Sequence, residues 1–259
     1  MNSLLFLGTG PGRPVAGRFS SSCVLRTPGA CVLVDAGEPC SQRLCEAQIS
    51  AADLDAVLIT HAHSDHTGGL PLLLQAAWLA PRSRPLAVYL PEELIEPLPA
   101  WLDAVLLPSS LLGFPLEFRA WKAGVPREVA PGVEVTPFPT THLDQLRQII
   151  DPSATGRFRA YGLDARCGGR RVVFSADLGD PADLAVVLAQ PCDVLVCELS
   201  HFSPEDLFTF LKGRSVGQLI LVHLAGDLAG KEDLLREAAR EALGGAPVTV
   251  ARDGELVGF

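Results

Sequence analysis

Four residues within a six-residue stretch carry side chains that bind transition metals. The segment T-H-A-H-S-D-H-T-G-G, residues 60–69, contains His61, His63, Asp65 and His66. Imidazole and carboxylate groups are the usual ligands of zinc and similar ions. Residues i and i+2 of an extended segment project to the same side, so His61 and His63 can bind one ion together. Asp65 and His66 follow where the chain turns, and they can reach a second ion beside the first.

Three more potential ligands each follow a short apolar run that is typical of a strand. Ligand sites in α/β folds gather beyond the carboxyl ends of strands. We therefore assign His142 to the first ion, His223 to the second, and Asp177 to a position that bridges both. Asp180 and Asp183 compete with Asp177, which lies nearest to the end of its strand. The three preceding runs are residues 133–138, 171–174 and 219–222.

A pair of ions held in this way predicts a hydrolase. Two metal ions about 3.5–4 Å apart lower the pKa of a bound water from about 15.7 toward about 7 and hold the oxygens of an ester or phosphodiester. We expect two divalent ions per chain, with zinc as the default and manganese or iron as alternatives. Asp65 is counted both as a ligand and as a catalytic carboxylate.

The elements that must position these residues alternate between short strands and helices. Residues 69–80 and 91–107 are predicted to be helical, and residues 231–243 have the spacing of an amphipathic helix. Because the early strands are adjacent, we expect an α/β fold with two mixed sheets and helices outside them. Pro and Gly are scattered rather than pooled in a linker, which favours one domain over residues 1–259. The early strands are predicted at residues 4–7, 22–26, 30–34 and 56–59.

The composition limits the partners and the compartment. The chain has a formal net charge of -9, which argues against binding to long nucleic acids, because phosphate contacts need Lys and Arg. Seven cysteines without a C-x-x-C pair predict a reducing cytoplasm rather than a disulfide framework. Residues 1–8 lack a basic region and predict a first strand instead of a signal peptide. The apolar stretch 69–80 is too short to cross a bilayer.

The ligand-rich segment resembles the signature of metallo-β-lactamase-fold hydrolases, and the likeness extends over essentially the whole chain. Within that superfamily, several segments are similar to the RNase Z branch. The resemblance implies an αββα sandwich and the ligand assignment given above. It also implies that Asp35 holds a metal-bound histidine in place. The local sequence fits equally well with an aspartate that only ends a strand. The segments similar to RNase Z are residues 6–10, 21–22, 32–38, 175–177 and 221–224.

The sixth histidine, His201, resembles a histidine of the phosphodiesterase of the carbon–phosphorus lyase pathway, where it is not a ligand. The resemblance implies that His201 faces the substrate phosphate and protonates the leaving alkoxide. The alternative is that His201 is an exposed loop residue without a catalytic role.

The chain departs from both relatives. Tyr161 leads directly toward the next strand without the long arm by which RNase Z grips tRNA, and residues 11–20 contain no cysteine for a structural zinc loop.

The stretch between His142 and Tyr161 contains three arginines. Arg157 and Arg159, together with Arg147, could bind a phosphate or carboxylate, or they could be ordinary solvated charges. The sequence thus predicts a phosphodiesterase for small-molecule or nucleotide substrates. A lactonase or thioesterase is the second hypothesis, and a non-catalytic protein that binds a ligand in its metal pocket is the third. A homodimer is left open, and no membrane partner is expected.

Overall fold

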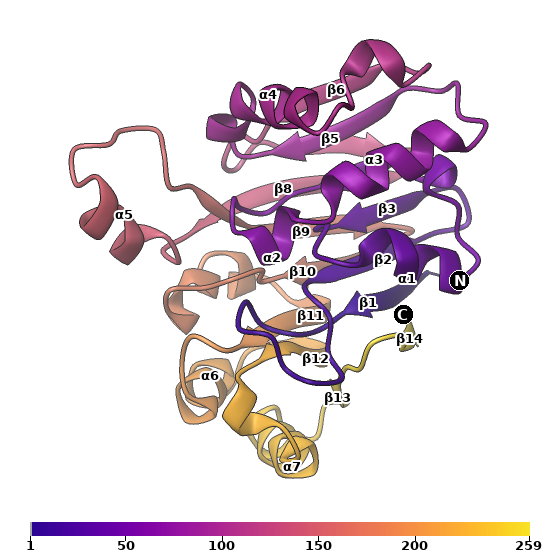
Figure 1. Ribbon diagram of the computed structural model, residues 1–259. Coiled ribbons are helices and arrows are strands. Elements are labelled where there is room, and N and C mark those ends of the chain that lie inside the picture. Colours follow the sequence, from indigo (N-terminus) through magenta and orange to yellow (C-terminus); the bar gives the residue numbers. More distant parts are fainter. Residues whose placement is uncertain (1) are drawn as a thin grey trace.

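Short runs of branched apolar residues form strands that are buried on both faces. β4 (Ala56–Leu58) is completely buried, and β11 (Cys192–Leu199) is buried at seven of its eight positions. Strands of this kind occur where helices cover a sheet whose other face packs into the core. In the computed structural model, which describes residues 2–259, two sheets pack face to face with helices on their outer sides (Figure 1). The predicted αββα sandwich is therefore confirmed.

Both sheets mix parallel and antiparallel pairing. In the first sheet the order is β14-β1-β2-β3-β4-β5-β6, and pairing is parallel from β3 to β6. In the second the order is β13-β12-β11-β10-β9-β8-β7, and pairing is parallel from β10 to β13. Parallel strands place their carboxyl ends at one edge, where the site lies. The remaining strands are β1 (Ser3–Gly8), β2 (Ser22–Arg26), β3 (Cys31–Val34), β5 (Leu86–Leu90), β6 (Leu116–Ala120), β7 (Arg127–Ala130), β8 (Val133–Thr140), β9 (Ala160–Cys167), β10 (Arg170–Phe174), β12 (Val216–Leu224), β13 (Val248–Val250) and β14 (Leu256–Gly258).

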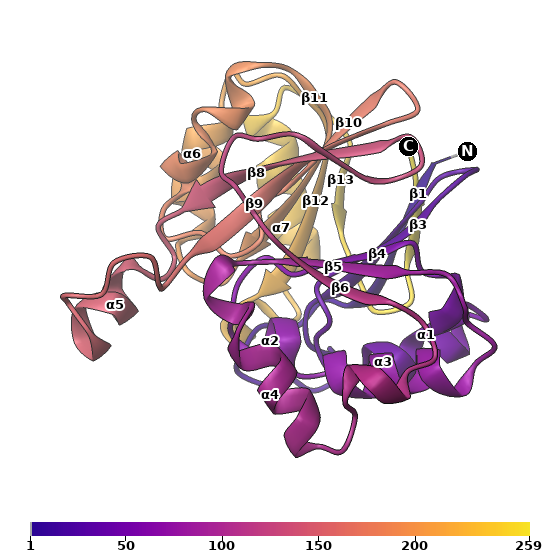
Figure 2. The ribbon, with the colours of Figure 1, turned by 90° about the horizontal axis from the view of Figure 1, so that it is seen from above.

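The helices form the two outer layers. Figure 2 shows α1, α3 and α4 along one side, α6 on the opposite side, and α5 projecting from the body. The α5 helix lies in residues 143–160, where the sequence predicted no element. No helix within residues 2–259 is long and apolar enough to cross a membrane. The helices are α1 (Cys40–Glu46), α2 (Ser64–Thr67), α3 (Leu70–Leu79), α4 (Pro97–Ala104), α5 (Asp144–Ile150), α6 (Pro204–Leu211) and α7 (Glu232–Ala242).

Short 3₁₀ turns connect several of these elements. They are η1 (Ala51–Asp53), η2 (Glu92–Leu94), η3 (Ser109–Leu111), η4 (Pro181–Leu184), η5 (Val187–Ala189) and η6 (Gly226–Leu228).

Three hydrophobic clusters hold the layers together. The central cluster lies between the sheets and includes Leu4 and Phe174. A second lies beneath α1 and α3 and includes the fully buried Leu73, and a third beneath α6 and α7 includes Leu207. Burial of one such side chain contributes about 1.5–3 kcal/mol. The layers therefore give rigid support to the loops that follow the strands.

Candidate metal centre

The segment that follows β4, together with α2, brings the first four potential ligands to the carboxyl edge of the first sheet. The backbone N–H of Thr60 donates to Asp35 Oδ1 at 2.8 Å, and its hydroxyl also donates to this carboxylate. His63 has an extended backbone and immediately precedes α2, whose first turn contains Asp65. The extended segment thus presents His61 and His63, and the short helix presents the next two ligands.

The first donor set consists of three histidines and one carboxylate. Ligand atoms of His61, His63, His142 and Asp177 all lie within 4.8 Å of one another. His142 Nε2 is 3.1 Å from His63 Nδ1 and 3.6 Å from Asp177 Oδ2. His61 Nε2 is 3.7 Å from the same oxygen. These residues come from three separate loops, which the two sheets bring together.

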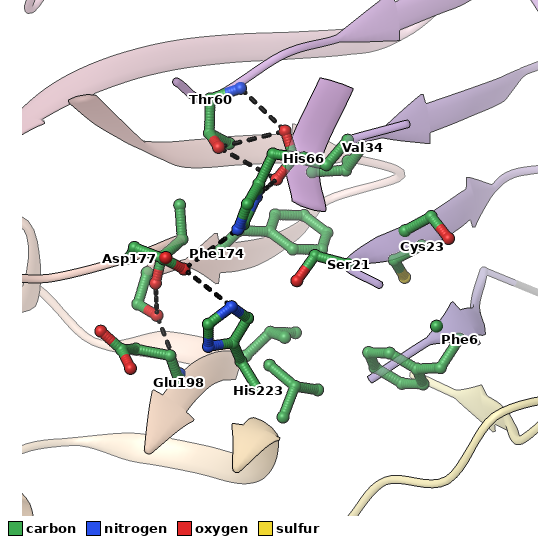
Figure 3. Close-up of a pocket in the computed structure, with 17 residues that line it drawn as sticks. Phe6, Ser21, Cys23, Val34, Thr60, His66, Phe174, Asp177, Glu198 and His223 are labelled. Carbon is green, nitrogen blue, oxygen red and sulfur yellow. Dashed lines mark hydrogen bonds and ion pairs between the residues drawn. The ribbon is translucent and has the colours of Figure 1, made fainter. Parts of the chain in front are cut away.

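The second donor set shares Asp177 with the first. Ligand atoms of Asp65, His66, Asp177 and His223 again lie within 4.8 Å of one another. His66 Nε2 is 3.3 Å from Asp177 Oδ1, and His223 Nε2 is 3.6 Å from that oxygen. Asp65 Oδ2 is 3.5 Å from His66 Nε2 and 3.2 Å from His223 Nε2. Figure 3 shows Asp177 lying between His66 and His223.

Asp177 offers one oxygen to each set. Its Oδ2 faces the ring nitrogens of His61 and His142, while its Oδ1 faces those of His66 and His223. Ala176, the preceding residue, has a positive φ of 50°, which turns the backbone sharply after β10. The two oxygens of one carboxylate are thus directed toward two separate donor sets.

The spacing and the unsatisfied atoms of the two sets fit metal ions. Tetrahedral ligands about 2.0–2.1 Å from zinc lie about 3.3–3.4 Å apart. Among the described residues, the buried Nε2 atoms of His61 and His66 have no hydrogen-bond partner. Leaving such atoms unpaired is costly unless something else binds them. His66 Nδ1 lies 2.7 Å from Asp35 Oδ2, so its other nitrogen is directed toward the donor set.

The electrostatics of the site suit cation binding. Burial holds the pKa of His61 well below its usual value and lowers the pKa of His142 to about 4, so both rings are neutral at pH 7. Burial raises the pKa of Asp177, but the surrounding histidines outweigh it and hold that pKa well below the usual range. Burial also opposes the charge on His66, yet the carboxylates of Asp177 and Asp35 raise its pKa well above the usual value. Neutral imidazoles and ionised carboxylates are the forms that bind metals, so His61, His142 and Asp177 are ready to bind an ion, whereas binding at His66 would release a proton.

His201 stands beside both sets without belonging to either. Its ring centroid is 4.5 Å from that of His142 and 5.8 Å from that of His223. His201 Nδ1 lies 2.7 Å from Oε1 of the buried Glu198, which also accepts hydrogen bonds from the backbone of Leu178 and Ser200. Burial lowers the pKa of His201, but the Glu198 carboxylate outweighs this and raises it. The sequence analysis gave Glu198 no role, although its position three residues before His201 was a usable signal.

The arginines singled out in the sequence lie outside the site. The Arg159 guanidinium is 2.5 Å from Glu92 Oε2, and its backbone N–H donates to Glu93. Arg157 packs over the ring of Phe158. Neither arginine lines the cavity in front of the donor sets. The acidic η2 turn, distant in sequence, accounts for the pairing of Arg159.

A cavity of about 790 Å³ opens in front of the donor sets. Ligands of both sets and His201 form its floor. The rest of its wall comes from Ser200 and from two loops, residues 11–15 after β1 and residues 225–227 after β12. The first loop contributes Arg13, which the sequence analysis did not single out. His223 itself lies within β12 rather than after it, because the register with β11 shifts beyond Glu198 and His223 adopts a positive φ of 50°.

Comparison with known proteins agrees with this fold. Residues 31–224 match the family described as "Beta-lactamase superfamily domain". A ribonuclease Z from Pseudomonas putida is 30% identical over 269 aligned positions, covering 86% of this chain and 84% of that protein.

Two solved structures share the fold at lower identity. The metallo-β-lactamase-fold protein YhfI from Bacillus subtilis has a TM-score of 0.78 at 21% identity, covering 99% of this chain and 98% of that one. A diphosphatase from the PhnP family has a TM-score of 0.71 at 18% identity, covering 100% and 98% of the two chains. The chain therefore belongs to the β-lactamase superfamily, as a metallo-β-lactamase-fold hydrolase related to ribonuclease Z.

Proposed function

We propose that this protein hydrolyses phosphodiester bonds of small-molecule or nucleotide substrates with the help of two divalent ions. The observation that carries the proposal is the position of Asp177, whose two oxygens face two separate donor sets. When bound, two such ions, with zinc as the default, would supply a water of lowered pKa and hold the phosphoryl oxygens. Manganese and iron suit similar donors.

His201 has the geometry of a proton donor to the leaving oxygen. Its Nδ1 is engaged by Glu198, so the imidazolium can release its other proton, from Nε2, toward the cavity. The buried carboxylate stabilises the charged ring and fixes its orientation. Because leaving alkoxides are strong bases, such protonation typically accelerates cleavage by about 10²–10⁴.

The choice of a phosphodiester rests on relatives as well as on geometry. The curated relatives carry the name ribonuclease Z, which denotes enzymes that act on RNA. A lactonase or thioesterase would use the same donor sets on a carbonyl group. His201 suits an alkoxide leaving group, which favours a phosphodiester or a lactone over a thioester. Between those two, the ribonuclease Z relatives favour the phosphodiester.

The choice of a small substrate rests on charge and size. Long nucleic acids are bound through many Lys and Arg contacts to phosphates, whereas this chain has a net charge of -9. Arg159 is neutralised by Glu92. The cavity of about 790 Å³ is a suitable size for a nucleotide-sized molecule.

The free cysteines, which include the buried Cys23 and Cys197, support a reducing, cytoplasmic location.

The experiment compares three substrates with one metal-analysed preparation. We expect two metal equivalents per chain and cleavage of bis-p-nitrophenyl phosphate at a higher kcat/KM than either a lactone or a precursor tRNA. Asp177→Asn serves as the control for metal-dependent turnover. Higher efficiency on the tRNA would overturn the small-substrate proposal. Turnover of the lactone alone would assign the carbonyl-ester chemistry instead, and turnover of none would favour a non-catalytic binder.

A further inference from the structure

The loop between β1 and β2 contains two arginines in opposite environments. Arg18 is largely buried, and its guanidinium donates to Thr9 Oγ1 at 2.7 Å and to the carbonyl of Ala251 at 2.8 Å. Arg13, five residues earlier in the loop, is exposed and lines the cavity in front of the donor sets. Among residues 2–259, no carboxylate forms an ion pair with Arg13. One arginine is therefore used to hold the loop, and the other is free to bind a ligand.

The loop holds Arg13 close to the second donor set. Both ends of the loop are fixed by Asp253, which accepts from the backbone N–H groups of Thr9 and Phe19. A Cβ on Gly12 would lie 3.1 Å from Asp65 Oδ2, so the backbone directly before Arg13 packs against a ligand. The loop crosses in front of the second sheet (Figure 1), and both it and residues 225–227 line the cavity. A Cβ on Gly226 would lie 3.6 Å from Val15, so the two segments adjoin each other. Prolines at positions 11 and 14 restrict the backbone on both sides of Arg13.

The charges around the cavity define what Arg13 can bind. Among the residues that line it, Arg13 is the only arginine or lysine, and Asp227 is the only carboxylate outside the donor sets. Arg13 lines the cavity without an ion pair to Asp65 or Asp177, so neither of these ligands occupies its guanidinium. A planar guanidinium with free donors suits a phosphate or carboxylate.

We propose that Arg13 is a specificity-determining residue that binds a second anionic group of the substrate, next to the phosphodiester that is cleaved. This inference rests on the proposed function and narrows it to phosphodiesters that carry a further phosphate or carboxylate. It assigns to Arg13 the role that the sequence analysis gave to Arg157 and Arg159.

The test compares two p-nitrophenyl phosphodiesters that differ only in their second ester group. One carries a methyl group and the other a 2-carboxyethyl group. We expect the metal-replete protein to prefer the carboxyethyl diester, and Arg13→Gln to lower the ratio of the two kcat/KM values by roughly ten- to hundredfold, the scale of a charge-assisted hydrogen bond. Arg13→Lys should retain part of the preference. The matched control is Arg26→Gln, an exposed arginine at the far end of β2, which should leave the ratio unchanged.

A binding measurement keeps the inference testable even without turnover. Metal-replete wild type and Arg13→Gln are titrated calorimetrically with methylphosphonate and with 2-carboxyethylphosphonate. A preference for the second compound that Arg13→Gln abolishes supports the inference even if neither diester is cleaved, in which case the proposed function alone fails. An Arg13→Gln variant that keeps the wild-type preference, or that weakens both compounds equally, overturns it.

Discussion

Replacement of His201 by alanine tests whether this histidine donates a proton to the leaving group or binds a metal ion. The side chain is 34% exposed and belongs to neither of the donor sets that contain Asp177. We therefore expect His201→Ala to keep both metal ions and to slow phosphodiester cleavage by roughly 10²–10⁴. The loss should be greatest for alkyl leaving groups and should shrink for p-nitrophenolate, which departs without a proton.

Glu198 supplies the internal check on this prediction. Its bond to His201 Nδ1 is 2.7 Å long, and a hydrogen bond to a charged group contributes about 1.5–3 kcal/mol, or about ten- to hundredfold in rate if it stabilises the imidazolium. Glu198→Gln should therefore slow the reaction less than His201→Ala does. If Glu198 acts through His201, the double variant should be no slower than His201→Ala alone.

The assay measures kcat/KM for a p-nitrophenyl diester and an alkyl diester, together with metal content and Tm for each variant. Glu198 also accepts three backbone hydrogen bonds, so Tm distinguishes a rate effect from partial unfolding. Loss of a metal equivalent from His201→Ala would identify His201 as a ligand. This alternative is tested because Glu198, His201 and His223 lie close enough together to form a third group of potential ligands. Unchanged rates on the alkyl diester would show that His201 is only a solvated loop residue.

Three further predictions address the ligands and the core. Asp177→Asn should reduce metal content at both positions, whereas His142→Ala should affect the first position only; loss of one equivalent in both variants would show that Asp177 does not bridge. Asp35→Asn should weaken binding of the second ion about 10–100-fold in a chelator competition, because Asp35 orients His66 through a 2.7 Å bond, and an unchanged affinity would leave Asp35 a purely structural role. In α3, Leu73→Ala should lower the free energy of unfolding by about 2–5 kcal/mol in urea titrations, while Leu79→Ala, at a position 70% exposed, should change it by less than about 0.5 kcal/mol. Equal losses at these two positions would contradict the assigned packing of the helix.

Much of the fold could be predicted from the sequence because its signals are local. Apolar runs of strand length, separated by turns and followed by helical spacing, predicted two mixed sheets with helices outside. The H-x-H-x-D-H segment placed four candidate ligands within six residues, where the backbone alone determines which side chains project together. The α5 helix was missed although Leu143, Leu146 and Ile150 recur at helical spacing. The run is short, and Ile149 and Ile150 are exposed, so the helix does not bury a full apolar face.

The tertiary structure decided which distant groups meet, because contacts between separate loops leave no local pattern. It gave Asp177 one oxygen for each donor set and placed Glu198 behind His201. It also placed the arginines differently from the sequence-based expectation. Arg159 meets the carboxylate of Glu92 from a turn more than sixty residues away, whereas Arg13 is carried to the cavity by a loop fixed to the other end of the chain. Charge alone predicts that an arginine side chain pairs with an anionic group. Only the packing of the two sheets determines which anionic group lies within its reach.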